Sequence, residues 1–258
     1  MALLDDLICE LANSESGIGF IYDALDHVSR DLQLSDAILI LETAETGLQI
    51  FRDRRKKLAE DSIPGGILEA PIGLHTEPPG AGDQIEPLLV KLCSVAIELD
   101  RAKHDASHDS LTGLLNRRSF DILLDQHCSQ STRYGWQFAL VLVDVDDFKD
   151  INDSLGHIAG DGVLKTIGAA LSSTLRSGDS AARVGGDEFA LVLANATFQG
   201  ALQAVARLKD TIALANVGVS VSTGVALAPE EGDSPEAIFK IADERLYKEK
   251  EDQSIERN

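Results

Sequence analysis

Three carboxylates stand within four positions at the end of one apolar segment. Asp144, Asp146 and Asp147 lie at or just beyond the end of a predicted strand, Phe138 to Val145, where a sheet presents side chains to a ligand crevice. Like charges this close repel one another, and a hard cation such as Mg²⁺, which prefers oxygen ligands, would relieve the repulsion. A solvated acidic turn is the alternative, and the cluster alone favours neither interpretation.

A second pair of carboxylates follows two glycines. In Gly185-Gly186-Asp187-Glu188 the glycines let the backbone turn sharply or approach a ligand closely. Alone, such a segment is usually only a turn. Together with the strand-end aspartates it could form a site in which metal ions polarise phosphates and a carboxylate accepts a proton from an attacking hydroxyl. The residues therefore indicate metal-dependent phosphoryl or nucleotidyl transfer.

Alternating helices and strands must position these two segments. Apolar periodicity predicts an α/β domain of about 150 residues after His104. We expect a central, mostly antiparallel sheet flanked by helices, with a tight hairpin at Gly185 and Gly186. The expected helices cover 116–124, 163–175, 202–212 and 235–247, and the expected strands cover 138–145, 180–184, 188–193 and 217–227.

The first part of the chain predicts a small, separate α/β module over residues 1–85. A helical stripe from Ile18 to Leu32 precedes a strand, Ala37 to Leu41, and a partner strand, Leu48 to Phe51. In its order of helix, hairpin, loop and closing helix the module resembles a shortened GAF sensor domain. The remaining landmarks are a basic stretch, Arg52 to Lys57, and loops at Pro64 to Gly66 and Pro78 to Gly82.

A heptad pattern marks a connecting helix over residues 86–107. Its apolar positions are Leu88, Leu92, Val95, Leu99, Ala102 and Ala106. This spacing is typical of a coiled-coil seam. Two interpretations remain open: the helix caps its own domain, or it forms a short parallel coiled coil that joins two copies of the chain and transmits a signal.

Composition limits the classes of function. With 258 residues, 44% of them hydrophobic, the chain can bury a substantial core, and its net charge of -20 argues against a general nucleic-acid binder. We expect a cytoplasmic protein without membrane contact, because no apolar run reaches roughly 18 residues and the N-terminus lacks a basic start. Cys9, Cys93 and Cys128 share no metal-binding spacing, so we expect reduced, buried thiols.

Three stretches in order resemble the diguanylate cyclase family, named for its GGDEF signature. They are DSLTGLLNRRSF from Asp109, DVDDFKDINDSLGHIAGD from Asp144 and RVGGDEF from Arg183. The resemblance covers about residues 105–258 and sets the domain over 108–258. It implies a palm-like α+β fold and the condensation of two GTP molecules into cyclic di-GMP.

The resemblance also implies roles for the acidic residues and one lysine. Asp144, the backbone carbonyl of Val145, Asp187 and Glu188 would bind Mg²⁺, with Mn²⁺ as an alternative ion. Asp187 would also accept the proton of the ribose 3′-hydroxyl. Lys149 would stabilise charge on the phosphates in the transition state.

Further positions match those that bind substrate or product. Asn152 and Asp161 match the guanine-reading pair, and Arg176 and Asp179 match an inhibitory RxxD site for the product. The other implied substrate contacts are Phe148, Gly185, Gly186 and Lys250, whereas Asp109, Asn116 and Arg117 look structural.

The C-terminus departs from the family pattern. A glycine and an arginine are expected three and four positions after Lys250, and Gln253 and Ser254 stand there instead. We expect weaker substrate binding from this loss, not a different reaction.

The expected function is therefore a Mg²⁺-dependent diguanylate cyclase that works as a homodimer, because two domains, each holding one GTP, must face one another. Product inhibition and control by the N-terminal module are expected. One alternative is a non-catalytic receptor for cyclic di-GMP or GTP, although such relatives usually carry a degraded signature. A nucleotide cyclase or polymerase-like palm domain with another product is the second alternative.

Overall fold

A computed structural model of the protein describes residues 7–8, 11, 14, 16–34, 36–43, 47–52, 73–77, 79–81, 83–215 and 217–256. The chain divides into two compact units, residues 1–104 and 105–258. Several features singled out from the sequence lie outside the described residues: Cys9, the basic stretch after Arg52, the loop Pro64 to Gly66, Pro78 and Gly82.

The N-terminal unit contains a three-stranded antiparallel sheet in the order β2-β1-β3. Helix α2 (Gly17–Asp31) precedes β1 (Asp36–Thr43) and β2 (Gly47–Arg52), so the predicted helix and hairpin are confirmed. Strand β3 (Gly73–Glu77) was not expected from the sequence. The core includes Phe20, Leu25 and Leu39, all of which are fully buried.

Helix α3 (Glu86–Ser107) has two apolar faces. Leu89, Cys93 and Ala96 are buried in the core of the N-terminal unit. The later positions of the heptad pattern lie elsewhere on the helix, where Val95 is 44% exposed and Leu99 is 45% exposed. One face therefore builds the unit. Of the heptad positions, Leu92 packs against the same core, whereas Val95 and Leu99 are exposed.

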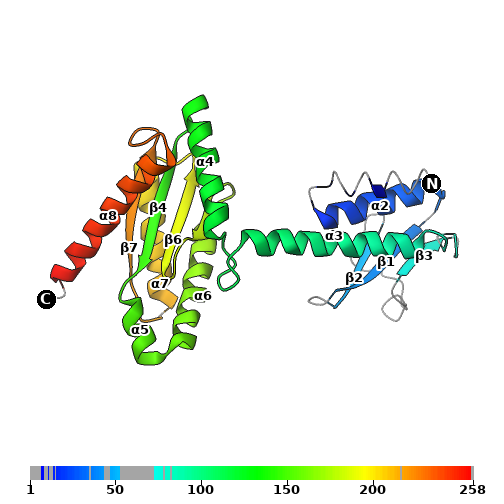
Figure 1. Cartoon of the computed structure of the whole chain (residues 1–258), viewed down its shortest axis with the longest axis horizontal. Coiled ribbons are helices and arrows are strands. Elements are labelled where there is room, and N and C mark those ends of the chain that lie inside the picture. The colour runs from blue at the N-terminus through cyan, green and yellow to red at the C-terminus, as the bar shows by residue number, and fades with distance from the viewer. Residues whose placement is uncertain are drawn as a thin grey trace. The chain divides into compact units, whose positions relative to one another are not determined.

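The C-terminal unit is built on a four-stranded antiparallel sheet in the order β5-β6-β4-β7, which confirms the predicted fold class. Its strands are β4 (Phe138–Val145), β5 (Ser180–Arg183), β6 (Glu188–Ala194) and β7 (Val221–Ala228). Helices α6 (His157–Thr174) and α7 (Phe198–Ala215) cover one face (Figure 1). Helices α4 (Arg117–Tyr134) and α8 (Pro235–Glu256) cover the other. The short α5 (Phe148–Leu155) follows β4.

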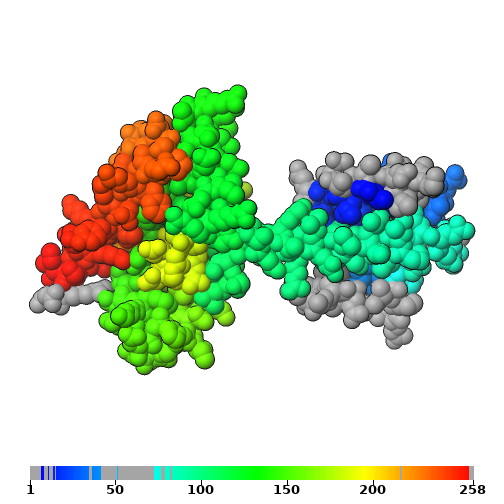
Figure 2. Space-filling model, in the orientation of Figure 1, coloured from blue at the N-terminus to red at the C-terminus, as the bar shows by residue number. Residues whose placement is uncertain are grey.

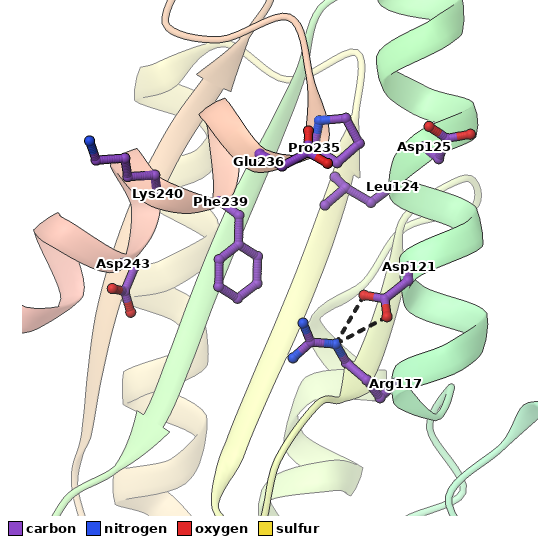
Figure 3. Close-up of a pocket in the computed structure, with 9 residues that line it drawn as sticks. All are labelled: Arg117, Asp121, Leu124, Asp125, Pro235, Glu236, Phe239, Lys240 and Asp243. Carbon is purple, nitrogen blue, oxygen red and sulfur yellow. Dashed lines mark hydrogen bonds and ion pairs between the residues drawn. The ribbon is translucent and has the colours of Figure 1, made fainter.

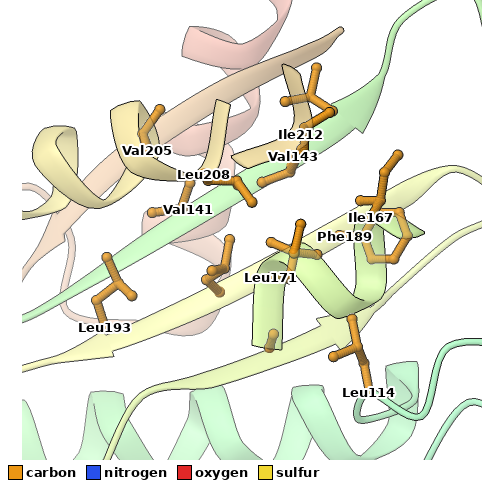
Figure 4. Packing of buried hydrophobic residues seen from close by; sticks show 14 of the residues in the cluster. Leu114, Val141, Val143, Ile167, Leu171, Phe189, Leu193, Val205, Leu208 and Ile212 are labelled. Atoms are coloured by element: carbon orange, nitrogen blue, oxygen red, sulfur yellow. The ribbon is translucent and has the colours of Figure 1, made fainter. Parts of the chain in front are cut away.

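Strand β4 shows how the sequence assigns side chains to the two faces. Val141 and Val143 pack with α6 and α7 (Figure 4), whereas Leu140 and Leu142 belong to the cluster beneath α4 and α8. Because side chains alternate along a strand, Asp144 follows Leu142 onto the α8 side. Asp144 is only 7% exposed.

Several predicted boundaries were wrong. Helix α6 begins at His157 rather than at Val163, and α7 begins at Phe198 rather than at Leu202. Helix α4 continues past Leu124 to Tyr134, and α8 continues past Tyr247 to Glu256. Strand β7 begins at Val221 rather than at Val217. The physical reason for the late start is Gly218, whose φ of 73° interrupts the extended backbone between Val217 and the strand.

Two of the three cysteines are described, and both are buried free thiols, as predicted. Burial raises the pKa of Cys93 to about 12. Burial and nearby carboxylates raise the pKa of Cys128 to about 11. Among the described helices, none combines the length and apolar character that crossing a membrane requires.

Candidate functional site

The carboxyl end of β4 opens into a pocket of about 300 Å³. This pocket brings together five of the predicted site residues with Lys250 of α8. Its lining is Asp144, Val145, Asp146, Asp147, Phe148, Lys149, Asp187, Lys250, Gln253 and Ser254. In the space-filling view the segment around the β5–β6 hairpin, in yellow, reaches the surface between α8 and the α5–α6 region (Figure 2).

An ion pair dominates this pocket. The ammonium Nζ of Lys250 lies 2.6 Å from Oδ1 of Asp144, with the lysine side chain 40% exposed and the aspartate side chain 11% exposed. Burial raises the pKa of Asp144, and the charges of Asp187 and Glu188 act in the same direction, while Lys250 opposes them. A carboxylate in this position requires a cation, and Lys250 supplies one.

The donor set fits a hard divalent ion, although the described residues do not form a ready cluster. No three His, Cys, Asp or Glu side chains among them are close enough together to hold a metal. Asp144, Val145 and Asp187 nevertheless line one pocket, and a cation already stands at Asp144. Carboxylate and carbonyl oxygens are the ligands that Mg²⁺ and Mn²⁺ accept. Glu188 does not line the pocket.

Hydrogen bonds from two serines stabilise the carboxylate of Asp146 in the strand-end cluster. Its two carboxylate oxygens accept hydrogen bonds from Ser220 at 2.5 Å and from Ser222 at 2.6 Å. Its backbone N–H also donates to the carbonyl of Ser220 at 3.0 Å. The repulsion expected from the sequence is thus partly relieved by hydroxyls of the neighbouring strand, and Asp146 fixes the loop that carries Asp147.

Backbone pairing places the signature hairpin beside β4. Asp144 and Glu188 are register partners on β4 and β6. The N–H of Val145 donates to the carbonyl of Asp187 at 3.2 Å, and the N–H of Val184 donates to the carbonyl of Glu188 at 2.9 Å. The predicted hairpin between β5 and β6 is confirmed, and it holds Asp187 at the mouth of the pocket.

A side-chain bridge fixes the tip of this hairpin. Arg183 donates to the carbonyl of Gly186 at 2.7 Å and pairs with Asp109 at 3.2 Å. Asp109 also accepts from the N–H of Thr112 at 2.9 Å and from its hydroxyl at 2.7 Å. Burial alone would raise the pKa of Asp109, but the bonds from Thr112 and Arg183 outweigh it and lower that pKa.

We expect Asp109→Asn to destabilise the protein at neutral pH by about 1–3 kcal/mol, the usual scale for loss of a charge-assisted hydrogen bond. Because the folded-state pKa is lowered, this stabilisation is present above the unfolded pKa near 4 and is lost as the pH falls through the folded pKa. Urea unfolding at about pH 7 and about pH 3.5 measures the difference in unfolding free energy between parent and variant. A difference in unfolding free energy that did not shrink at the lower pH would contradict the proposed role of the charge.

Asn152 and Asp161 lie outside the 300 Å³ pocket, on α5 and α6. A Cβ placed on Gly160 would lie 2.1 Å from Oδ1 of Asn152 and 3.2 Å from the ring of Phe148. Any side chain at Gly160 would therefore displace them. The structure brings Asn152 and Phe148 together over Gly160, with Asp161 the next residue along α6.

The two residues of the RxxD pattern share a second pocket, of about 210 Å³. Asp179 accepts from the backbone N–H of Arg176 at 3.0 Å and from that of Ala194 at 3.1 Å, so its carboxylate closes the loop before β5. Arg207 of α7 lines the same pocket and was not singled out from the sequence. A lone arginine on an amphipathic helix carries no signal of its own; only the fold brings it to Arg176.

A larger pocket, about 620 Å³, lies between α4 and α8 (Figure 3). Arg117 pairs with Asp121 at 2.9 Å, and its guanidinium lies 5.5 Å from the ring centre of Phe239. These contacts agree with the structural role expected for Arg117. None of the strand-end or hairpin carboxylates lines this pocket, so its size alone does not make it the candidate active site.

Comparison with known proteins places these features in one family. The family model described as "Diguanylate cyclase, GGDEF domain" matches residues 106–255. The chain is 39% identical over 155 residues, 56% of its length, to diguanylate cyclase TpbB of Pseudomonas aeruginosa (strain UCBPP-PA14), and 40% identical over 159 residues, 59% of its length, to cyclic di-GMP phosphodiesterase PdeR of Escherichia coli (strain K12). The matches span only 35% and 24% of those relatives.

Solved structures agree on the fold. The coiled coil and GGDEF domain of DgcB from Caulobacter crescentus, in complex with c-di-GMP, matches with a TM-score of 0.58 at 27% identity. The match covers 62% of this chain and 89% of that chain.

Proposed function

The chain belongs to the GGDEF-domain family of diguanylate cyclases, and on that premise we propose that it condenses two GTP molecules into cyclic di-GMP with release of two pyrophosphates. The observation that supports this most strongly is the pocket in which Asp144, Asp187 and Lys149 meet. A phosphoryl-transfer site needs carboxylates for a metal ion and a cation for the phosphates. This pocket offers both.

Each residue then has a specific task. A bound Mg²⁺, or Mn²⁺ in its place, would be held by Asp144, Asp187 and the Val145 carbonyl, with Glu188 nearby, and would polarise the α-phosphate. Asp187 accepts the proton of the 3′-hydroxyl that attacks the second nucleotide. Lys149, which is exposed at the pocket, and Lys250 then contact phosphates.

The guanine would lie on the α5–α6 side of the pocket. An amide can meet the acceptor edge of guanine, and a carboxylate can accept from its N1 and N2 hydrogens. Asn152 and Asp161 supply these groups. Phe148, packed beside Asn152, and the backbone at Gly185 and Gly186 complete the nucleotide contacts.

The test of the reaction is incubation of the purified protein with GTP and Mg²⁺, followed by chromatography of the products, with Asp187→Ala run in parallel. We expect cyclic di-GMP from the parent and none from the variant. Equal product from both proteins would rule out Asp187 as the proton acceptor, and no product from the parent at high concentration would favour a receptor.

The receptor alternative has one observation in its favour. A relative of similar identity, PdeR, is named for a phosphodiesterase rather than a cyclase, so family membership alone does not fix the activity. Against it stand Asp144, Lys149, Asp187 and Glu188, which are all present. A cyclase that is switched off by its product would also bind cyclic di-GMP, so binding alone does not separate the two functions.

Product inhibition would act through the pocket of Arg176, Asp179 and Arg207. Two guanidinium groups can fork to phosphates and stack on guanine, while Asp179 holds the loop. We expect Arg176→Ala to raise the cyclic di-GMP concentration needed for half-inhibition by about tenfold or more, the scale of one charge-assisted contact. Initial rates at increasing product concentration measure this. Arg118→Ala, at an exposed position on α4, is the control; unchanged inhibition in Arg176→Ala would contradict the site.

The remaining parts of the chain would serve assembly and control. The later heptad positions of α3, where Val95 and Leu99 are exposed, would pair two copies, because one domain holding one GTP cannot close the ring. The N-terminal unit, with its three-stranded sheet, would act as a GAF-like sensor that adjusts this pairing. The domain limits that follow are a sensor over 1–85, a connecting helix over 86–107 and a cyclase domain over 108–258.

A further inference from the structure

Polar side chains of α8 and of the loop before it bond to the edge of the sheet formed by β7. Strand β7 lies at the edge of the sheet, so every second backbone group points away from β4 and needs another partner. The N–H of Thr223 donates to Glu249, the carbonyl of Val225 accepts from Arg245 at 2.6 Å, and the N–H of Leu227 donates to Glu231 at 2.8 Å. Arg245 and Glu231 also pair with each other at 2.5 Å.

Glu249 reaches around this edge and ties together both faces of the sheet. Besides the N–H of Thr223, its carboxylate accepts from the hydroxyl of Thr223 at 2.9 Å. Its other oxygen lies 2.5 Å from Nζ of Lys209, on α7. Helix α8 packs on one face and α7 on the other. Glu249 therefore links two helices that the sheet separates. The guanidinium of Arg245, 5.4 Å from the ring centre of Phe198 at the start of α7, is a second contact between them.

Apolar packing of α8 ends shortly before Glu249. Ile238, Ala242 and Leu246 are the α8 residues buried in the core, and Leu246 is the last of them. A helix continuing to Glu256 without further apolar contacts would fray over its final turns. Glu249 lies three positions after Leu246, on the same side of the helix. There, polar bonds take the place of apolar contacts in holding α8 to the sheet.

Helix α8 also lies unusually close to β7. A Cβ on Gly224 would lie 1.9 Å from the carbonyl oxygen of Ala242, so only glycine permits this approach. The same Cβ would lie 2.6 Å from the backbone nitrogen of Leu246, so close packing at Gly224 fixes α8 up to about one turn before Lys250. The orientation of the last turns depends on the anchor at Glu249.

The anchor has a direct consequence for the active site. Ser222 of β7 is the register partner of Asp144, and Thr223 is the next residue along the strand. Lys250, the residue after Glu249, places its ammonium 2.6 Å from Asp144. Fixing Glu249 on Thr223 thus fixes the point from which Lys250 reaches the pocket.

We propose that Glu249 is a positioning residue: it clamps the last turns of α8 to Thr223 and Lys209 and so holds Lys250 at the nucleotide site. This inference rests on the proposed function, in which Lys250 contacts GTP phosphates. Lys250 is especially important in this chain, because Ser254 stands where a second phosphate-binding cation was expected. The placement of Lys250 therefore matters more than in a chain with two such cations.

The test is a double-mutant cycle on nucleotide binding by the full chain. Calorimetry with Mg²⁺ and a GTP analogue that has a methylene group between the α- and β-phosphates measures affinity without reaction. We expect Glu249→Ala and Lys250→Ala each to weaken binding by about tenfold, the effect of one charge-assisted contact. The double variant should bind no more weakly than Lys250→Ala. Glu249→Gln, which keeps an acceptor for Thr223, should recover part of the loss.

The matched control is Glu244→Ala, on the same helix but 65% exposed and weakly paired to Lys240 at 3.9 Å. It should leave affinity unchanged. A purely structural role for Glu249 predicts a lower melting temperature in Glu249→Ala with unchanged affinity, or losses that add in the double variant. Either result would overturn the proposal.

Hydrogen–deuterium exchange separates this inference from the proposed function. In Glu249→Ala, amides of residues 247–256 should exchange faster while those of 235–246 stay protected. If the parent does not bind the analogue, the proposed function has failed, and the exchange result still decides whether Glu249 anchors the helix. Unchanged exchange over 247–256 would contradict the anchor.

Discussion

Asp144→Asn should abolish cyclase activity while leaving the protein at least as stable as the parent. Loss of one charged metal ligand removes several kcal/mol of transition-state stabilisation, so we expect product formation to fall by about 1,000-fold or more. The amide keeps the size of the carboxylate, and the change therefore tests charge rather than packing. Cyclic di-GMP formation with GTP and Mg²⁺ measures the loss.

The expected stability follows from the environment of Asp144. Burial, Asp187 and Glu188 all raise its pKa despite the ion pair with Lys250. Because the folded-state pKa is raised, the ionised group opposes folding above that pKa, and the parent gains stability as the pH falls through it. Asp144→Asn should thus have an equal or higher melting temperature at about pH 7, with the difference vanishing at low pH.

The control is Asp146→Asn, which changes a neighbouring carboxylate that bonds to Ser220 and Ser222. This variant should retain more activity than Asp144→Asn and should lose stability. If Asp144→Asn kept activity within about tenfold of the parent, a metal-ligand role would be excluded, because a lost ligand costs several kcal/mol.

Leu99→Glu should convert an active dimer into an inactive monomer. Leu99 is 45% exposed on the heptad face of α3, whereas the core of the N-terminal unit uses Leu89, Cys93 and Ala96. A charge there would oppose pairing of two copies without removing a core side chain. Tethering commonly raises effective concentration by about 10²–10⁴-fold, so we expect activity at low protein concentration to fall by about 100-fold.

Sedimentation velocity and cyclase rates across a range of protein concentrations measure both effects together. Activity of Leu99→Glu should rise more steeply with protein concentration than that of the parent. Arg101→Gln, two positions along the same helix and outside the heptad pattern, is the control and should leave both properties unchanged. A fully active monomer, or a variant that remains dimeric, would contradict the role of this face.

The sequence predicted most reliably where one physical pattern acted alone. The unbroken apolar run from Phe138 to Val143 and the residues that follow it indicated the limits of β4 correctly, because a strand buried on both faces needs no polar alternation. Strand β3, Gly73–Glu77, was missed because His75 and Thr76 interrupt its apolar character between loop-forming residues. The start of β7 was wrong because Gly218, with a positive φ of 73°, interrupts the extended backbone after Val217.

Site residues were predicted where residue type and order carried the signal. Asp144, Lys149 and Asp187 stood in the signature stretches and meet in one pocket. Glu249 and Arg207 carried no such signal, since a charged residue on a helix is usually solvated. Glu249 joins α8 to β7 and α7, and Arg207 shares a pocket with Arg176 and Asp179. These segments are distant in sequence, so the two residues could be recognised only in the folded chain.

The central claim, that this chain joins two GTP molecules, is tested most directly by isotope mixing. The purified protein is incubated with Mg²⁺ and equal amounts of unlabelled and ¹⁵N-labelled GTP, and the products are weighed by mass spectrometry. We predict cyclic di-GMP in three masses, with the mixed species about twice as abundant as either pure species and none of the three from Asp187→Ala. GTP left unchanged by the parent, or converted to a mononucleotide product without a mixed species, would contradict the claim.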